Sequence, residues 1–177
     1  FRGTDIIAEN DAGLVLIDQF ALHRLLLFET IAKSIKKKEV PFETLKGSLL
    51  LELTQQESLL IEQHIETLTI SGFTITPFGG STFAVNSFPK FLFEDEVNNV
   101  ISKILTRSAF FKKNLNVEEI LKDIALIIAE FASIKPEQKL EMEEIECLLV
   151  QWEALGSPKS SIQDTPILVE LTVHELE

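Results

Sequence analysis

Several features that mark particular classes of protein are missing from this 177-residue sequence. A single cysteine, Cys147, excludes an internal disulfide framework and fits a reducing cytoplasm. No apolar run reaches the roughly 18–20 residues that span a bilayer, and no charged-then-apolar leader opens the chain. Neither membrane insertion nor secretion is therefore indicated, and we expect a cytoplasmic protein.

Basic residues are also scarce, since 16 Lys and Arg oppose 28 Asp and Glu and the formal net charge is −12. Phosphate contacts require basic residues in excess, which excludes a nucleic-acid-binding surface spread over the whole molecule. The basic clusters of the sequence contain Lys33, Lys36, Lys37, Lys38, Lys112 and Lys113. The first cluster ends a predicted helix, where cations oppose the helix dipole, so DNA contact at Lys36, Lys37 and Lys38 is expected to be weak and local.

Common catalytic motifs are absent as well, because the sequence has no Gly-rich phosphate loop, serine nucleophile elbow or dinucleotide fingerprint. His23, His64 and His174 lie far apart, and none has a second His or Cys at the spacing of a zinc site. We expect each to be a surface or boundary imidazole, and Cys147 to be a small core residue of its helix. The residues alone favour a binding or assembly module without a cofactor or a bound metal.

The composition that is present, 45% hydrophobic and 25% charged, is enough for a sizeable core in one domain or two small lobes. Periodicity and turn residues predict an α/β (α+β) protein with short mixed sheets and about five helices. Predicted strands cover residues 6–9, 14–17, 49–53, 73–76, 82–85 and 167–171. Predicted helices cover residues 19–38, 54–71, 94–107, 116–132 and 141–155.

Local signals support these boundaries. Capping boxes are formed by Thr54 with Glu57, Asn116 with Glu119, and Thr172 with Glu175. Pro41 is expected to start a loop, and the turn around Gly79 and Gly80 predicts a hairpin. The helix over residues 116–132 is apolar nearly all round, which predicts that it is deeply buried.

Two stretches of the sequence, 7–21 and 72–85 continuing to Pro89, resemble the C-terminal dimerisation domain of the DNA mismatch-repair protein MutL. The order of the remaining elements also fits, so the resemblance covers essentially the whole chain. It implies a dimerisation lobe, 1–40 with 117–177, and an external lobe, 41–116, inserted into it. Because the chain starts at Phe1 rather than Met, we expect it to be part of a longer protein.

Many members of this family are metal-dependent endonucleases with the signature D-Q-H-A-x-x-E-x-x-x-x-E. This sequence retains the positions Asp18, Gln19, Ala21 and Glu29. Phe20 replaces the motif histidine and cannot bind a metal, and Arg24 replaces the first motif glutamate with a fixed positive charge. The resemblance therefore implies that the metal site is degraded.

The remaining ligands of the family also have no match. Ala125 and Leu126 stand where the family has Ala-Cys, and the family segment C-P-H-G-R-P corresponds to residues 161–166, with Ser161 for Cys and Gln163 for His. Two ligand-type residues are left. We expect Asp18 to cap the following helix and Glu29 to be a solvated helix residue.

The sliding-clamp-binding segment of the family, similar to Q-P-L-L-I-P-L, corresponds to residues 43–49. Glu43 replaces the glutamine, and a carboxylate can only accept hydrogen bonds. Leu45 and Leu49 are retained as apolar positions, but both prolines are lost. The segment is therefore a degenerate clamp-binding motif.

The leading hypothesis is a homodimerisation module that tethers two N-terminal ATPase domains around DNA, with mismatch-repair partners reached through the parent protein. Candidate interface residues are Ile7, Val15, Leu168 and Leu171. Ordinary core is the alternative for each, because alternation cannot say which apolar face meets a partner. Two other functions stay open, a residual metal-dependent DNA-nicking endonuclease and an unrelated regulatory ligand-binding α/β domain.

Overall fold

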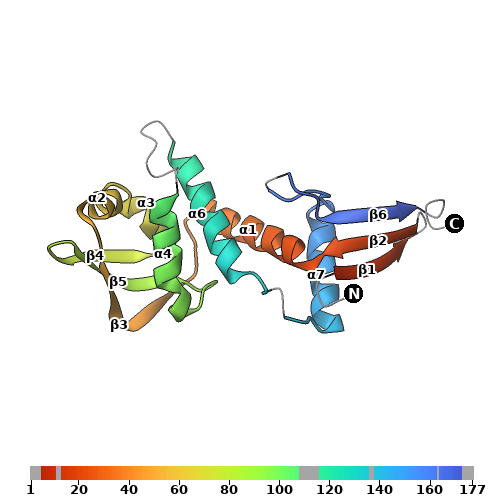
Figure 1. Ribbon diagram of the computed structural model, residues 1–177, viewed down its shortest axis with the longest axis horizontal. Coiled ribbons are helices and arrows are strands. Elements are labelled where there is room, and N and C mark those ends of the chain that lie inside the picture. The colour runs from red at the N-terminus through yellow and green to blue at the C-terminus, as the bar shows by residue number, and fades with distance from the viewer. Residues whose placement is uncertain (1–4, 11–12, 108–115, 136–137, 163, 173–177) are drawn as a thin grey trace. The chain divides into compact units, whose positions relative to one another are not determined.

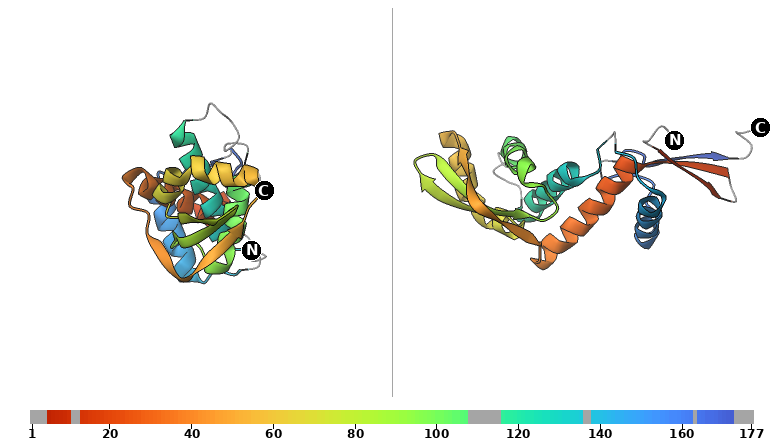
Figure 2. Two further views of the ribbon diagram at one scale, coloured as in Figure 1. Left: turned by 90° about the vertical axis from the view of Figure 1, so that its left-hand side faces the viewer. Right: turned by 90° about the horizontal axis from the view of Figure 1, so that it is seen from below.

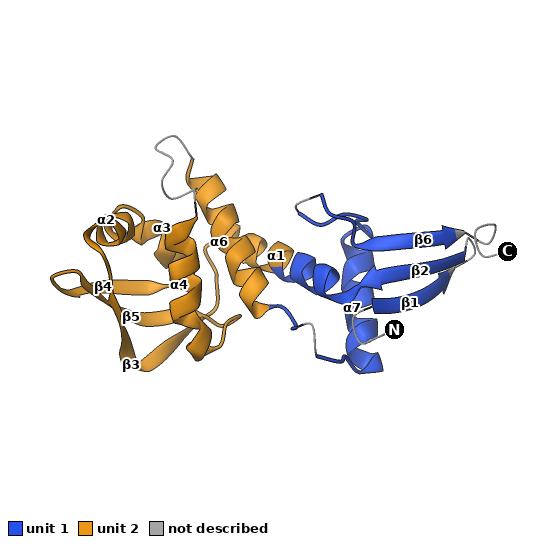
Figure 3. Ribbon diagram, viewed as in Figure 1, with its two compact units in different colours: residues 1–27, 133–177 blue, residues 28–132 orange. Residues whose placement is uncertain are grey.

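A computed structural model describes residues 5–10, 13–107, 116–135, 138–162 and 164–172. The chain divides into two compact units, which Figure 3 colours separately. Unit 1 comprises residues 1–27 and 133–177, and unit 2 comprises residues 28–132. The predicted lobes place their boundaries at residues 40 and 117 instead, and their division into a dimerisation lobe and an external lobe stays a prediction.

Unit 1 contains a three-stranded sheet formed by β1 (Asp5–Asn10), β2 (Gly13–Asp18) and β6 (Leu168–Thr172), in the order β1-β2-β6. Both pairings are antiparallel, as the arrows in Figure 1 show. The long helix α1 (Gln19–Lys37) follows β2 directly, and its residues up to Leu27 belong to this unit. Helix α7 (Met142–Ala154) completes the unit.

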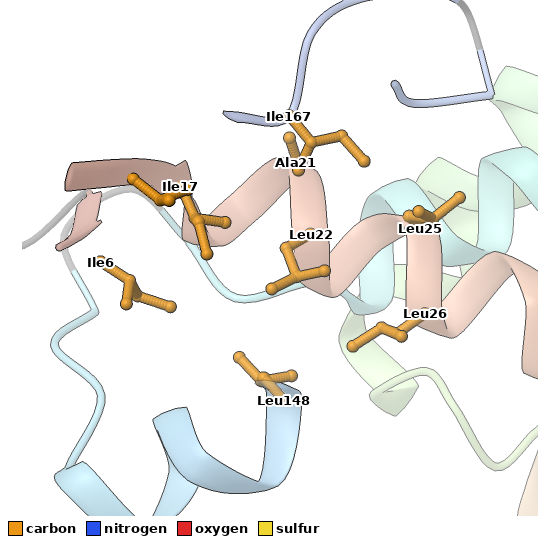
Figure 4. Close-up of a cluster of buried hydrophobic side chains, with 9 residues drawn as sticks. Ile6, Ile17, Ala21, Leu22, Leu25, Leu26, Leu148 and Ile167 are labelled. Carbon is orange, nitrogen blue, oxygen red and sulfur yellow. The ribbon is translucent and has the colours of Figure 1, made fainter. Parts of the chain in front are cut away.

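The core of unit 1 forms where one face of this sheet meets α1 and α7. Ile6, Val15 and Ile17 project from the strands and pack with Leu22 of α1 and Leu148 of α7, as Figure 4 shows for most of the cluster. Leu22 and Ile17 are almost completely buried. Burial of a side chain of this size contributes about 1.5–3 kcal/mol relative to exposure, so this cluster fixes which side of the sheet faces inward.

Unit 2 contains a second antiparallel sheet with the order β3-β5-β4. Its strands are β3 (Phe42–Glu52), β4 (Thr74–Gly79) and β5 (Thr82–Pro89). Its helices are α2 (Gln55–Gln63), α3 (Ile65–Ile70), α4 (Val97–Thr106) and α6 (Val117–Ala132), with a 3-10 turn at Glu94–Glu96. Figure 2 shows these elements from two further sides. Phe83 and Val85 of the central strand are buried, as are Ile101 and Ile104 of α4.

Local polar contacts set several of these boundaries. The Thr54 hydroxyl accepts from Glu57 N–H at 3.3 Å, and a Glu57 carboxylate oxygen accepts from Thr54 N–H at 2.8 Å, which confirms the first capping box. Asn116 and Glu119 make the same reciprocal pair at 2.8 and 3.2 Å. Residues 173–177 lie outside the described part of the chain, so the capping box of Thr172 with Glu175 stays a prediction.

The mixed α/β class is confirmed, with several corrections. Both sheets are wholly antiparallel rather than mixed, since the hairpins β1-β2 and β4-β5 are each joined by an antiparallel strand from elsewhere in the chain, β6 and β3 respectively. The predicted helix over 54–71 is divided at His64, which has non-helical dihedral angles (φ −115°, ψ 18°). Pro41 does not start an extended loop, since β3 begins at the next residue.

Two expectations about burial are also wrong. Cys147 is exposed, because α7 turns Leu148 toward the core and leaves Cys147 on its solvent side. Helix α6 is not buried all round, because its polar residues share an exposed side. Those exposed residues are Glu118, Glu119, Lys122 and Glu130.

Candidate dimer interface

The strand register of unit 1 assigns every residue of its sheet to one of two faces. Ile7 pairs with Leu16, and Leu16 pairs with Val169, so these three side chains share one face. Leu14 and Leu171 are paired on the same face, and the exposed Glu9 pairs with Leu14 at its edge. We call this set of five apolar residues the outer face.

The outer face is accessible in the described part of the chain. Ile7 is 51% exposed and Val169 is 56% exposed, while Leu14, Leu16 and Leu171 are half-buried. Helix α7 packs against the opposite side of the sheet through Leu148, and Figure 2 shows the sheet edge-on with that helix on one side. No described element of unit 1 covers the outer face.

The corresponding face of the sheet in unit 2 has a different chemistry. Asn86 at its centre accepts from the Ser48 hydroxyl at 2.7 Å through Oδ1 and donates to the Thr76 hydroxyl at 3.0 Å through Nδ2. Polar side chains thus cross all three strands there, next to the exposed Leu50. A polar ladder of this kind tolerates water, whereas five adjacent apolar side chains favour burial.

The structure separates the four predicted interface candidates. Ile7 and Leu171 lie on the outer face, whereas Val15 and Leu168 lie on the inner face. Val15 is a correction to the prediction of exposed positions, because it is only 8% exposed and belongs to the core cluster. Leu168 is partly buried and packs against the same cluster.

Sequence reasoning missed Leu14, Leu16 and Val169. Counting outward from the gap between the predicted strands 6–9 and 14–17 pairs Ile7 with Leu16, but the register of the distant β6 has no comparable local signal.

The retained residues of the nuclease signature surround the start of α1. One carboxylate oxygen of Asp18 accepts hydrogen bonds from Phe20 N–H and Ala21 N–H, both at 2.9 Å. Asp18 is therefore the N-cap of α1, as expected. Gln19 is buried, and its side-chain amide donates to the Gln138 carbonyl at 3.3 Å.

Glu29, the other ligand-type residue, is exposed on α1. It lies 11 positions after Asp18, and at 1.5 Å per residue the helix separates the two by about 16 Å. Within the described ranges, no group of three or more His, Cys, Asp or Glu side chains is placed to hold a metal ion.

The other segments that correspond to family ligands have ordinary structural roles where they are described. Ala125 is buried and Leu126 is half-buried on α6. Ser161 donates its backbone N–H to the Thr165 carbonyl at 2.8 Å and closes a tight turn. Gln163 lies outside the described residues.

Two histidines take part in packing rather than in a metal site. The Nδ1 atom of His23 accepts from Ile134 N–H at 3.0 Å, and burial lowers the pKa of His23 below its ordinary value. Burial also lowers the pKa of His64, at the junction of α2 and α3. His174 lies outside the described residues.

The degenerate clamp-binding segment lies in β3. Glu43 is exposed and pairs with Phe88, and Leu49 pairs with Val85, with a register shift between Thr44 and Leu49 that includes Leu45.

The basic cluster lies at the end of α1. Lys36, Lys37 and Lys38 are all exposed, and Lys38 has a left-handed φ of 57° just past the last helical residue. Clamp binding and DNA contact at these two segments stay predictions.

An open apolar sheet face is what a domain needs in order to associate with another protein surface. Residues 1–140 match the family model described as the MutL C terminal dimerisation domain, so the chain belongs to that family.

The chain is similar to curated proteins that are each named DNA mismatch repair protein MutL. It is 28% identical to that of Halalkalibacterium halodurans over 99% of this chain, 29% identical to that of Clostridium tetani over 100%, and 29% identical to that of Staphylococcus saprophyticus over 99%. These alignments span only 27–28% of the relatives' own lengths. Among the described helices, none is both long and apolar enough to traverse a bilayer.

Proposed function

We propose that the chain is the homodimerisation module of a MutL-type mismatch-repair protein and that two copies associate through the outer face of unit 1. The observation that carries this proposal is the set of five adjacent apolar side chains on a face that no described element covers. A two-fold axis brings the same patch of both copies together, so one apolar face is sufficient.

The five residues of the outer face are too few to form a stable interface by themselves, so we propose that the interface extends beyond them. Stable protein–protein interfaces bury roughly 1,200–2,000 Å² in total, or 20–30 residues on each side. Five side chains form the centre of such an area rather than all of it. The half-buried Leu14, Leu16 and Leu171 supply the packed centre, and the more exposed Ile7 and Val169 flank them.

The length of the relatives leaves room for further domains, which supports a tethering role for the dimer. The chain spans about a quarter of each MutL protein that it matches, and we propose that the remainder includes an N-terminal ATPase domain. Dimerisation then holds two such domains at an effective concentration in the millimolar range. Nucleotide-dependent contact between them would close a ring around DNA.

We also propose that the metal site of this copy is degraded. Phe20 and Arg24 replace two ligands of the family signature. The Asp18 carboxylate is engaged by two backbone N–H groups, which leaves one retained acidic residue, Glu29, exposed on the helix surface. A nicking role would need ligands that these segments do not supply.

The dimer interface is tested by placing a charge on the outer face. Val169→Glu places a carboxylate within the proposed interface, next to its apolar centre, so we expect the dimer to dissociate while the far-UV circular dichroism spectrum is unchanged. Sedimentation velocity at micromolar concentration measures the change. Ile7→Glu, on the other edge of the same face, should act in the same way.

Val150→Glu is the matched control, because Val150 is 66% exposed on α7, away from the outer face. It should remain dimeric. A dimeric Val169→Glu chain together with a monomeric Val150→Glu chain would move the interface from the sheet to the helix and refute the proposal.

A further inference from the structure

A pocket of about 300 Å³ lies in unit 1, between the inner face of the sheet and the C-terminal part of α7. This volume is at the lower end of the range for ligand pockets and accommodates one or two side chains rather than a large cofactor. Most of its strand residues, among them Ala8 and Val15, belong to the inner face, whereas Glu9 pairs with Leu14 of the outer face. The apolar lining of the pocket therefore lies on the opposite side of the sheet from the proposed dimer interface.

One wall of the pocket is apolar and aromatic. Val15, Leu149 and Leu168 line it together with Trp152. The indole Nε1 of Trp152 donates to the Pro158 carbonyl at 3.0 Å, which satisfies its polar atom and fixes the ring. A ligand at this wall meets a pre-oriented aromatic surface and does not have to replace a lost hydrogen bond.

The polar part of the lining is acidic. Lys159 binds both carboxylate oxygens of Glu170, at 2.9 and 2.8 Å, so that this pair is neutral overall. Glu153 and Glu9 also line the pocket, and within the described residues no cation forms a salt bridge with either of them. The net charge of −12 adds a field that attracts cations and repels anions.

We propose that this pocket binds a short peptide segment with a basic side chain next to an apolar one. The apolar side chain fills the volume against Leu149 and Trp152. The Lys or Arg side chain places its cation near the Glu153 carboxylate and the indole ring. The combination selects against acidic peptides, because a ligand carboxylate would face Glu153 without a free cation to pair with.

Trp152 provides a direct readout, because it is the only tryptophan of a sequence that has no tyrosine. We would titrate the 177-residue chain with N-acetyl-leucyl-arginine amide and follow the tryptophan emission. The citrulline analogue has the same shape without the charge, and the glutamate analogue reverses the charge. We expect saturable binding of the arginine peptide, about twofold to fivefold weaker binding of the citrulline peptide, and no saturation with the glutamate peptide.

Two glutamate-to-glutamine substitutions on α7 distinguish an effect of the pocket from an effect of the overall negative charge of the protein. Glu153→Gln should reduce the preference for arginine over citrulline, whereas Glu143→Gln, exposed on α7 and not part of the lining, should leave it unchanged. Equal binding of all three peptides, no saturable change with any, or equal effects of the two substitutions would each overturn the proposal. Circular dichroism and sedimentation confirm that both variants keep the parent's fold and association state.

Discussion

His23 couples the protonation of one side chain to the packing of unit 1. Its Nδ1 atom accepts from Ile134 N–H at 3.0 Å, which requires that nitrogen to be unprotonated. Burial lowers its pKa in the folded chain, so the unfolded chain, with an ordinary value of about 6.5, binds the proton more tightly. The contribution of His23 to the free energy of unfolding is therefore fully present above the unfolded pKa of about 6.5. It is lost as the pH falls from there through the lower pKa of the folded chain.

His23→Gln tests this coupling. Glutamine keeps an acceptor oxygen but does not titrate, so the free energy of unfolding should fall less steeply between about pH 7 and about pH 5 than in the parent chain. Urea unfolding across this range measures it. His64→Gln is a second variant, since burial also lowers the pKa of His64. An unchanged slope in the His23 variant would contradict the role given to this side chain.

The N-cap of helix α1 is Asp18, which is also the first residue of the family's metal-binding signature. Asp18 ends β2, and its carboxylate accepts from two N–H groups of the first turn of α1. Its backbone N–H donates to the Ile167 carbonyl at 2.8 Å, which ties the same residue to the segment before β6. The junction of strand and helix therefore depends on hydrogen bonds made by Asp18.

Asp18→Ala should lower the free energy of unfolding by about 1 kcal/mol, the usual cost of losing an N-cap. Asp18→Asn keeps an acceptor oxygen and should be close to the parent. Glu29→Ala, on the exposed middle of the same helix, should change the value by less than about 0.5 kcal/mol. Urea unfolding measures all three, and a parent-like Asp18→Ala chain would show that the cap is dispensable.

Helix boundaries were predictable because local chemistry sets them. Thr54, Asn116 and Asp18 each precede a helix and each accepts from the backbone of its first turn, as a cap must. Sheet faces were not predictable in unit 1, because β2 reads Leu-Val-Leu-Ile, residues 14–17, with no polar residue to mark the outside. A strand that is buried on both faces is apolar throughout. Its sequence does not show whether the second face is covered by a helix of the same chain or by another copy of the chain.

The exposed Cys147 has a similar explanation. Helix α7 carries apolar residues on both sides, with Leu148 turned inward and Met142 and Val150 left exposed. Periodicity cannot choose between two apolar sides. The remnant metal motif, by contrast, could be interpreted from the sequence alone, because Phe20 and Arg24 fail as ligands on chemical grounds in any fold.

The molecule as a whole is acidic and represents about a quarter of each relative that it matches. The charge of −12 opposes broad binding to phosphates, in line with the expectation of weak and local contact with DNA. The alternative function, a residual nicking endonuclease, would instead require this chain to contact DNA directly. It requires a metal ion to be held close to DNA with Asp18 among its ligands.

Incubation of the chain with supercoiled plasmid and Mn²⁺ distinguishes the two. We expect no conversion to the nicked form above the level of a metal-free control, measured by agarose electrophoresis. Asp18→Asn, which should fold like the parent, serves as the matched variant. Nicking by the parent that disappears in Asp18→Asn would establish an endonuclease and overturn the assignment of a degraded site.

The pairing of β6 with β2 has a consequence for how the sequence can change. Successive residues of β6 alternate between core and outer face, since Leu168 pairs with Ile17 and Val169 pairs with Leu16. One residue inserted within β6 would exchange these two sets, exposing core side chains and turning the outer ones inward. The residues between α7 and Ile167 are not part of the β2–β6 ladder, so their number does not set this register. Insertions and deletions among descendants of this chain should therefore accumulate before Ile167 and stop there.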